Sequence, residues 1–301
     1  MNLFVTEYSK MNFDSLSPII PAIFFIVIFL SFLVLEKFSP LRHKSYSLIV
    51  RLITNVSLSA ISFLVVLLLV SPASQNAISW SSENNFGLLY LIKLPAVIEG
   101  IIAFLLMDLA FYYWHKANHK IPYLWRFHNV HHIDPDLDVY TSFRFHFGEI
   151  TFSAIFRIIQ LSIIGITPFT FYIYEICFTA NTMFQHSNVK LPIRFERILN
   201  KIIVTPRMHA IHHSQFRNET DSNFSTVFSW WDRLHKTIRL NVFRREIVIG
   251  VPGYTKSGDN NLGNVLLLPF KKQRDYWKKP DGSTQIKREK YSSKDKTRLE
   301  E

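Results

Sequence analysis

The sequence LPAVIEGIIAFLLMDLAFYYWHKANH, residues 94–119, runs from a long apolar segment directly into two histidines. About 20 predominantly apolar residues cross the hydrocarbon core of a bilayer as a helix. The segment from about Ile92 to Trp114 therefore predicts a membrane-spanning helix. His115 and His119 follow at its end with i, i+4 spacing, which places both imidazoles on one helix face. The stretch thus predicts a membrane protein with a histidine site near one membrane surface.

Further apolar segments lie on both sides of this one, in a chain of 301 residues that is 48% hydrophobic. Residues 18–36 and 52–72 each predict another span. Residues 18–36 are expected to be retained, because no basic segment precedes them and no small-residue cleavage site follows. The region 150–186 is too long for one crossing and is broken by GITP at 165–168. It predicts a hairpin of two helices, either transmembrane or re-entrant.

The distribution of basic residues predicts the orientation of these helices. The loop 37–51 contains four lysines and arginines, whereas the N-terminus and the loop 73–91 contain almost none. The positive-inside rule therefore places 37–51, every histidine cluster and the C-terminus on the cytoplasmic side. We expect an all-α integral membrane protein with about four to five transmembrane or re-entrant helices and a cytoplasmic helical cap. The net charge of +11 fits cytoplasmic loops and anionic lipid, and we expect no nucleic-acid partner.

Two further clusters repeat the spacing H-x-x-H-H, and ten of the twelve histidines lie between residues 115 and 213. Positions i, i+3 and i+4 share one helix face, so each cluster aims its imidazoles in one direction. Pro122 is expected to end the preceding helix and to begin a new one that returns toward the same point. The two clusters are HNVHH, with His128, His131 and His132, and HAIHH, with His209, His212 and His213.

Neutral imidazole is a ligand for iron, copper, nickel and zinc, so these clusters predict metal binding. Ten imidazoles exceed what one ion can take, whereas two ions would leave open positions for oxygen or substrate. No H-E-x-x-H motif is present, which disfavours zinc-protease chemistry. Two redox metals therefore fit best, although zinc can occupy such a site in a purified sample because its intrinsic affinity exceeds that of ferrous iron.

The motifs HKANH, HNVHH and HAIHH together resemble the histidine boxes of the fatty acid hydroxylase / sterol desaturase superfamily of integral-membrane di-iron oxygenases. Flanking words such as RFHFGE, QHSN and WWDRLHKT resemble the family as well, over roughly residues 100–237. Two departures are Phe147, where relatives commonly have proline, and His235, where they often have an aromatic residue.

The resemblance implies a centre of two iron ions with O2 as co-substrate and a lipid-like substrate. It implies metal ligands at His115, His119, His128, His131, His132, His146, His186, His209, His212 and His213. Helical spacing makes Asp108, two turns before His115, a candidate for orienting a ligand imidazole, and Glu149 a second such candidate. His43, which lies among basic loop residues, and the divergent His235 are left out of the site.

The apolar spans, the resemblance and the composition of the tail suggest three parts: an N-terminal transmembrane hairpin with loops (1–91), a fatty acid hydroxylase-like catalytic domain (92–245) and a basic, partly disordered cytoplasmic tail (246–301). We expect hydroxylation or desaturation of a membrane lipid: a sterol, fatty acyl, carotenoid or ether lipid. Neither an H-P-G-G nor a G-x-G-x-x-G word occurs, so a separate ferredoxin, cytochrome or reductase is the expected electron donor.

Two alternatives remain from the sequence. A histidine-rich membrane metal transporter or sensor would need ionisable residues along several spans, whereas Asp108 and Glu175 are the main acids within them. An inactive homologue that only binds lipid is the other alternative.

Overall fold

We describe a computed structural model of the chain, which places residues 19–44, 46–243 and 246–284. The regular structure within these ranges is helical, and strand-like pairing there is confined to isolated β-bridges. The expected all-α class is therefore confirmed. Its longer helices are α2 (Ile19–Phe38), α3 (Leu48–Val65), α4 (Ser71–Glu83), α5 (Ala96–Lys120), α6 (Pro122–His132), α7 (Phe147–Ile164) and α8 (Pro168–His186). Its shorter helices are α9 (Ile193–Leu199), α10 (Pro206–His212), α11 (Arg217–Thr220), α12 (Trp230–Leu234) and α13 (Leu262–Leu267).

Four helical segments of the described chain are long and apolar enough to cross a membrane, and the chain is therefore treated as a membrane protein. They are Ile19–Phe38, Leu48–Leu91, Ala96–Lys120 and Phe147–Ile164. Three of the expected spans correspond to α2, α5 and α7. The fourth, expected at 52–72, is much longer than the sequence indicated.

The long second segment corrects the prediction of a loop at 73–91. α3 continues through a π-helical turn at Val66–Val70 into α4, which ends at Glu83. The polar composition of 71–83 suggested a loop, but its small residues Ser74, Ala77 and Ser81 are buried, and α4 packs against α7. Helix–helix interfaces in membranes favour such small residues, because they let the backbones approach closely.

The break at GITP produces the expected helical hairpin. Gly165 ends α7 with φ 74°, a left-handed conformation that a residue with a Cβ adopts at a cost. A Cβ at this position would also lie 2.9 Å from the ring of Tyr90. Pro168 then occupies the first turn of α8, and the Thr167 hydroxyl accepts a hydrogen bond from the backbone N–H of Thr170.

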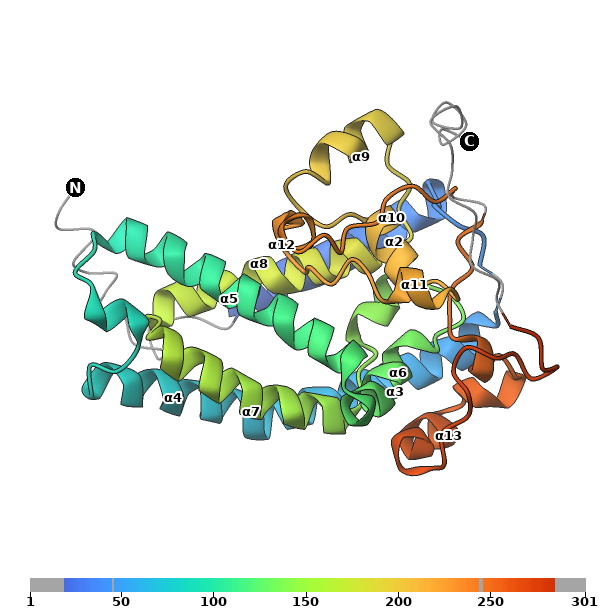
Figure 1. Ribbon diagram of the computed structural model, residues 1–301, viewed down its shortest axis with the longest axis horizontal. Helices are drawn as coiled ribbons and strands as arrows, with labels where there is room; N and C mark the ends of the chain where they lie inside the picture. Colours follow the sequence, from blue (N-terminus) through green and yellow to red (C-terminus); the bar gives the residue numbers. More distant parts are fainter. Residues whose placement is uncertain (1–18, 45, 244–245, 285–301) are drawn as a thin grey trace.

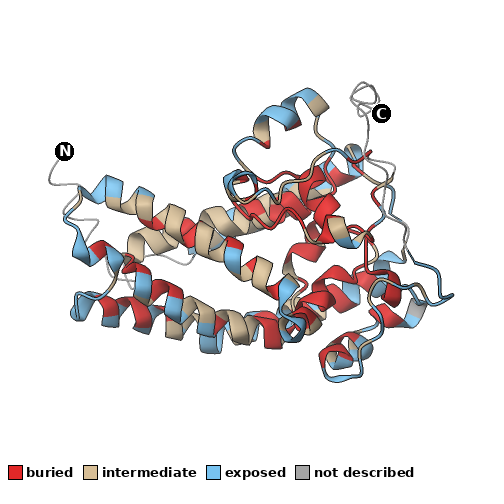
Figure 2. Ribbon diagram, viewed as in Figure 1, coloured by how far each residue is buried: buried red, intermediate tan, exposed pale blue. Residues whose placement is uncertain are grey.

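The long helices α4, α5, α7 and α8 run lengthwise through the molecule (Figure 1). At one end of this bundle lie α6, α10, α11 and the red-orange segment that contains α13 (Figure 1). Buried residues are concentrated at that end, whereas the outer faces of the long helices are exposed (Figure 2). We refer to this densely buried end, residues 121–146, 187–243 and 246–284, as the cap. Its location on the cytoplasmic side stays a prediction.

The C-terminal segment contributes to the core of the cap. Val251, Tyr254 and Val265 share one apolar cluster with Leu58 of α3 and Trp125 of α6. The expected division at residue 246 stays a prediction, and the end of the expected tail, residues 285–301, lies outside the described residues.

A buried ion-pair network joins α3 to the cap. Arg51 Nε lies 2.7 Å from Asp134 Oδ1, and Arg51 Nη1 lies 2.8 Å from Asp138 Oδ2. All three side chains are almost completely buried. Because Asp134 and Asp138 lie in the segment that follows His132, the network fixes the position of this segment against the membrane-spanning helix.

Arg144 extends this network toward α7. It donates hydrogen bonds to the Val130 carbonyl at 2.8 Å, to Asn55 Oδ1 at 2.7 Å and to Asn260 Oδ1 at 2.7 Å. One guanidinium therefore connects α3, α6 and the C-terminal segment, and its own backbone lies directly before the start of α7.

We expect Arg51→Leu to reduce the free energy of unfolding by about 3–5 kcal/mol, because it removes the buried cation that pairs with both Asp134 and Asp138. The measurement is thermal unfolding of the detergent-solubilised protein, followed by tryptophan fluorescence. Lys37→Leu, which removes an exposed cation from α2, is the matched control. Equal melting temperatures for the two variants would show that the network does not stabilise the fold.

Candidate metal centre

Four helices bring nine of the ten candidate histidines together within the cap and at its border with the bundle. His115 and His119 lie in the last turns of α5, and His186 is the last residue of α8. The first H-x-x-H-H cluster lies on α6, and the second lies on α10 and the residue that follows it. The turn at Pro122 reverses the chain between α5 and α6, as the sequence predicted, so that these two helices face each other.

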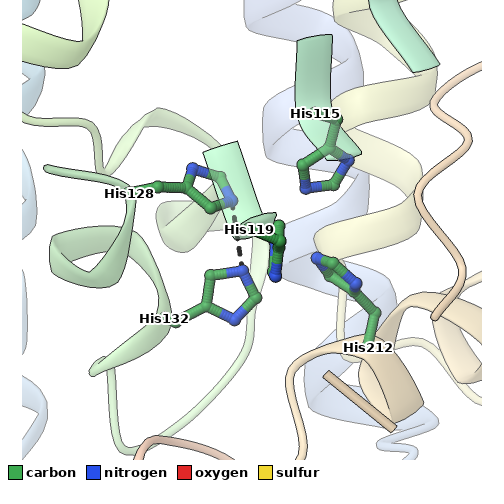
Figure 3. Close-up of side chains that lie close together, drawn as sticks. All are labelled: His115, His119, His128, His132 and His212. Atoms are coloured by element: carbon green, nitrogen blue, oxygen red, sulfur yellow. Dashed lines mark hydrogen bonds between the residues drawn. The ribbon is translucent and has the colours of Figure 1, made fainter. Parts of the chain in front are cut away.

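The nine histidines form two groups, within each of which the ligand nitrogens lie no more than 4.8 Å apart. Figure 3 shows the side chains of the first histidine group converging from α5, α6 and α10. The first histidine group consists of His115, His119, His128, His132 and His212. The second histidine group consists of His131, His186, His209 and His213.

The spacing of the ring nitrogens fits metal ligation. A nitrogen-to-metal bond of about 2.0–2.1 Å, with neighbouring bonds at right angles, sets the nitrogens about 3 Å apart. In the first group, Nε2 of His128 lies 3.2 Å from Nε2 of His132. In the second group, the corresponding distances are 3.0 Å from His186 to His131, 3.0 Å from His186 to His209 and 3.1 Å from His209 to His213.

Two ring nitrogens of the first group support the same conclusion. Nε2 of His119 and Nε2 of His212 are buried and have no hydrogen-bond partner. A buried polar atom without a partner is costly, and a metal ion would satisfy both lone pairs. The described residues therefore fit two metal ions held mainly by imidazole.

Hydrogen bonds at Nδ1 orient four of the imidazoles. A backbone carbonyl can only accept, so each of these rings carries its proton on Nδ1 and offers the Nε2 lone pair to a metal. The pairs are His115 with the Phe224 carbonyl (2.8 Å), His131 with Arg144 (3.2 Å), His186 with Thr182 (2.7 Å) and His212 with Ser222 (2.7 Å).

Glu149 orients a fifth imidazole. The sequence had suggested this residue as a candidate for that role. Its Oε1 lies 2.7 Å from Nδ1 of His128, and both side chains are buried. A carboxylate that accepts the Nδ1 proton raises the basicity of the opposite nitrogen and fixes the orientation of the ring. Glu149 lies in the first turn of α7, so this contact also connects α7 to α6.

Asp108 has a different role from the one we expected. It contacts none of the site histidines: it accepts hydrogen bonds from the backbone N–H groups of Val227 and Phe228 and from Nε1 of Trp231. Two turns of α5 separate it from His115, and at this depth its neighbour is the loop before α12. This loop begins just after Phe224, whose carbonyl orients His115, so Asp108 acts on the site only through the loop.

His146 lies outside both histidine groups. Its Nδ1 accepts a hydrogen bond from the backbone N–H of Gly148, which makes it the N-cap of α7, and its Nε2 lies 3.1 Å from the Leu266 carbonyl. Both ring nitrogens are thus engaged by the backbone. We therefore leave His146 out of the proposed ligand set, although the sequence placed it there.

Sequence reasoning missed Asp232, which supports the same loop. Its carboxylate accepts hydrogen bonds from the backbone N–H groups of Phe224 and Ser225 and from the Thr237 hydroxyl. The acid is fully buried next to the carbonyl that orients His115. The word WWDRLHKT marked this region, but nothing in its spacing indicated where the carboxylate would bind.

Burial keeps five imidazoles of the cap neutral. It holds the pKa of His131, His132, His209 and His213 well below the ordinary value of about 6.5, and it lowers the pKa of His212 to about 3. Charge repulsion between neighbouring rings lowers the pKa of the first four further. Neutral imidazole is the form that binds a metal, so the site is ready for ligation at neutral pH.

A cavity of about 440 Å³ leads from the histidines into the bundle. It is bounded by α4, α5, α7 and α8, and its wall is mostly apolar. The cavity touches both groups, through His115 and His128 of the first and His131, His186 and His209 of the second. A ligand in this space would therefore meet the metal site with one end while its remainder lies between membrane-spanning helices.

Comparison with known proteins shows that this part of the chain is similar to one family. Residues 100–237 match the sequence model of the fatty acid hydroxylase family. The match contains both H-x-x-H-H clusters, the pair at the end of α5, His186 and Glu149. The resemblance drawn from the histidine motifs is thereby confirmed.

The chain is similar to several lipid-modifying enzymes. It is 27% identical to the ornithine lipid hydroxylase OlsE of Rhizobium tropici over 190 residues, which are 63% of this chain and 55% of that protein. It is 27% identical to cholesterol 25-hydroxylase of Mus musculus over 46% of each chain, and 28% identical to alkylglycerol monooxygenase of Homo sapiens over 45% of this chain and 29% of that one. The chain thus spans about half the length of the first two. No solved structure matches it.

We expect Glu149→Gln to weaken metal binding about 10–100-fold, the usual effect of removing the partner of a ligating histidine. The measurement is the metal content of the purified protein after equilibration with graded concentrations of a chelator. Glu83→Gln, at the exposed end of α4, is the control. Identical retention curves for the two variants would mean that the contact with His128 does not support the metal.

The metal-free protein is expected to lose stability as pH falls below about 6.5. The unfolded chain takes up protons there, whereas the folded cap holds His131, His132, His209, His212 and His213 neutral through their lowered pKa values. Each such histidine contributes a loss of up to about 1.4 kcal/mol per pH unit. Melting temperatures at pH 7.5, 6.5 and 5.5 test this. A flat profile in this window would contradict it.

Proposed function

We propose that the chain is a membrane-bound lipid hydroxylase that uses two iron ions and O2. The observation that carries the proposal is the position of the two histidine groups at one end of an apolar cavity between membrane-spanning helices. The similarity to enzymes named as lipid hydroxylases and monooxygenases supports hydroxylation over desaturation as the outcome.

The proposed ligands are the five histidines of the first group and the four of the second. Bound iron would activate O2 strongly enough to oxidise an unactivated C–H bond, which no amino-acid side chain can do. The protein's contribution is to aim the Nε2 lone pairs, through the carbonyls that accept from Nδ1 and through Glu149 on His128. Nine nitrogens shared between two ions would leave room for O2 to bind.

The cavity would supply substrate position and exclude water. Phe111, Phe145 and Phe178 are among the residues that form its wall, so an alkyl segment of a lipid would be held by apolar contact. Entry from the bilayer would avoid transfer of the lipid through water. Holding one C–H bond against the metal site while the rest of the molecule is immobilised is the main way such a site gains rate and selectivity.

Hydroxylation with O2 converts C–H to C–OH and reduces the second oxygen atom to water, so it needs a pair of electrons and two protons from outside the substrate. We propose a ferredoxin, cytochrome or reductase as the donor, docking on the cap. By the positive-inside rule, the basic loop 37–51 supports a cytoplasmic location for the cap. Such electron donors are also found on the cytoplasmic side.

A metal transporter fits the structure less well. It would need ionisable groups that are free to bind an ion along the spans. Asp108 is instead engaged by two backbone N–H groups and an indole, and the charge of Glu175 is compensated by Arg157 at 3.1 Å, which disfavours a cation there. The histidines themselves lie at one end of the bundle.

We expect His131→Ala and His212→Ala, one from each histidine group, each to reduce lipid hydroxylation by more than about 100-fold, since loss of a ligand exceeds the effect of losing its partner. The protein is reconstituted in vesicles of host lipid with ferrous iron, a reductase system and O2, after chelation of any bound zinc. Products are measured by mass spectrometry, with His43→Ala as the control outside both groups. Unchanged products in both site variants would refute the proposed oxygenase.

A further inference from the structure

The cavity that begins at the histidines ends in a group of polar side chains. Between the two ends its wall is mostly apolar, with Phe111 and Phe178 among the residues that form it. Polar atoms at this depth in a membrane bundle are costly and are rarely present without a role. The polar end is formed by Ser71, Ser74 and Gln75 of α4, Arg157 of α7 and Glu175 of α8.

Helix geometry gives the separation of the two ends. Arg157 follows Glu149 by eight residues on α7, which corresponds to about 12 Å at a rise of about 1.5 Å per residue. Glu175 precedes His186 by eleven residues on α8, or about 16 Å. Because Glu149 contacts His128 and His186 belongs to the second histidine group, the polar end lies about 12–16 Å from the metal site.

The charges of Arg157 and Glu175 compensate each other. Arg157 Nη2 lies 3.1 Å from Glu175 Oε1, and Nη1 donates to Gln160 Oε1 at 3.2 Å. The guanidinium also lies 5.8 Å from the ring centres of Phe171 and Tyr174. The cation is therefore held from several sides, and the pair has no net charge to offer an anionic ligand.

Glu175 has unused hydrogen-bonding capacity. Its Oε1 is buried beside the guanidinium, so the exposed remainder of the carboxylate is the part that a ligand can reach. The side chain as a whole is 39% exposed, and it forms part of the cavity wall. A carboxylate in this state favours a ligand that donates an O–H or N–H, and it repels a carboxylate or phosphate.

We propose that the Arg157–Glu175 end of the cavity binds the polar group of the lipid substrate, and that this group is a neutral hydroxyl. This inference rests on the proposed function and adds the substrate class. The hydroxyl donates to Glu175, and the apolar body of the substrate extends toward the histidines. The reacting carbon then lies about 12–16 Å from the hydroxyl, or about ten to thirteen bonds of an extended chain at about 1.2 Å per bond.

The first experiment measures where the reaction occurs. The reconstituted protein is given 1-tetradecanol or 1-hexadecanol, and the position of the new hydroxyl is determined by mass spectrometry. If Glu175 anchors the alcohol, the oxidised carbon lies at the same number of bonds from the original hydroxyl in both products. Oxidation at a constant distance from the methyl end would overturn the proposal.

The second experiment changes the charge at the polar end and measures binding, which does not depend on turnover. Native mass spectrometry of the iron-loaded protein compares 1-tetradecanol with tetradecanoic acid. We expect the wild-type protein to prefer the alcohol, and Glu175→Gln to shift the alcohol-to-acid ratio by about tenfold or more toward the acid, because it leaves Arg157 without its counter-charge. Glu99→Gln, which removes an acid from α5 away from the cavity wall, is the matched control and should leave the ratio unchanged.

The double variant Arg157→Met/Glu175→Met keeps an apolar contact between α7 and α8. It provides a second test if Glu175→Gln does not fold. It should bind 1-tetradecanol and tetradecane equally well. If host lipids are hydroxylated but neither variant changes these ratios, the pair only joins the two helices and this inference is wrong. If the wild-type protein oxidises no lipid and yet prefers the alcohol in a manner that depends on Glu175, the proposed function fails and the binding site stands.

Discussion

The hydrogen bond at Nδ1 is the interaction on which the candidate metal centre depends. An imidazole can turn about its side-chain bonds and can carry its proton on either nitrogen, so spacing alone does not aim a lone pair. In four of the nine site histidines a backbone carbonyl accepts the Nδ1 proton, and in a fifth Glu149 does so. These acceptors need rigid positions of their own. The buried carboxylates of Asp108 and Asp232 provide them for one loop by binding its backbone N–H groups.

The same requirement explains why so many charges are buried in the cap. The Arg144 carbonyl accepts a hydrogen bond from His131, and its guanidinium donates to Asn55 and Asn260. The residue that orients a ligand is therefore itself held by three elements. Arg51 performs the corresponding task for the segment after His132. Buried ion pairs are weak sources of stability compared with apolar packing, but removing one partner is severe. Their value here is that they fix backbone positions relative to a membrane-spanning helix.

The sequence was sufficient for features that depend on local periodicity. Long apolar runs marked all four spanning segments, although the second extends further than expected; Gly165 and Pro122 marked the reversals, and i, i+4 spacing grouped the histidines. It was insufficient where tertiary contacts decide. The polar composition of 71–83 suggested a loop, because the sequence of this segment alone does not show that α4 packs against α7. His146 and Asp108 carried suitable chemistry at suitable spacing, but their side chains bind backbone groups more than 110 residues away, at Leu266 and Phe228. The carbonyls that orient the site carry no sequence signal, because every residue has one.

The hairpin of α7 and α8 connects the metal site to the proposed substrate anchor. α7 carries Glu149 and Arg157, and α8 carries His186 and Glu175, so each helix contributes once to each end of the cavity. The conformation of Gly165 and the adjacent Pro168 fixes the register between the two helices. A shift of one helix would therefore disturb the histidines and the anchor together. It follows that the distance between reacting carbon and polar group is built into the backbone. A change of substrate within this architecture would then require new side chains on the cavity wall, while the helices keep their positions.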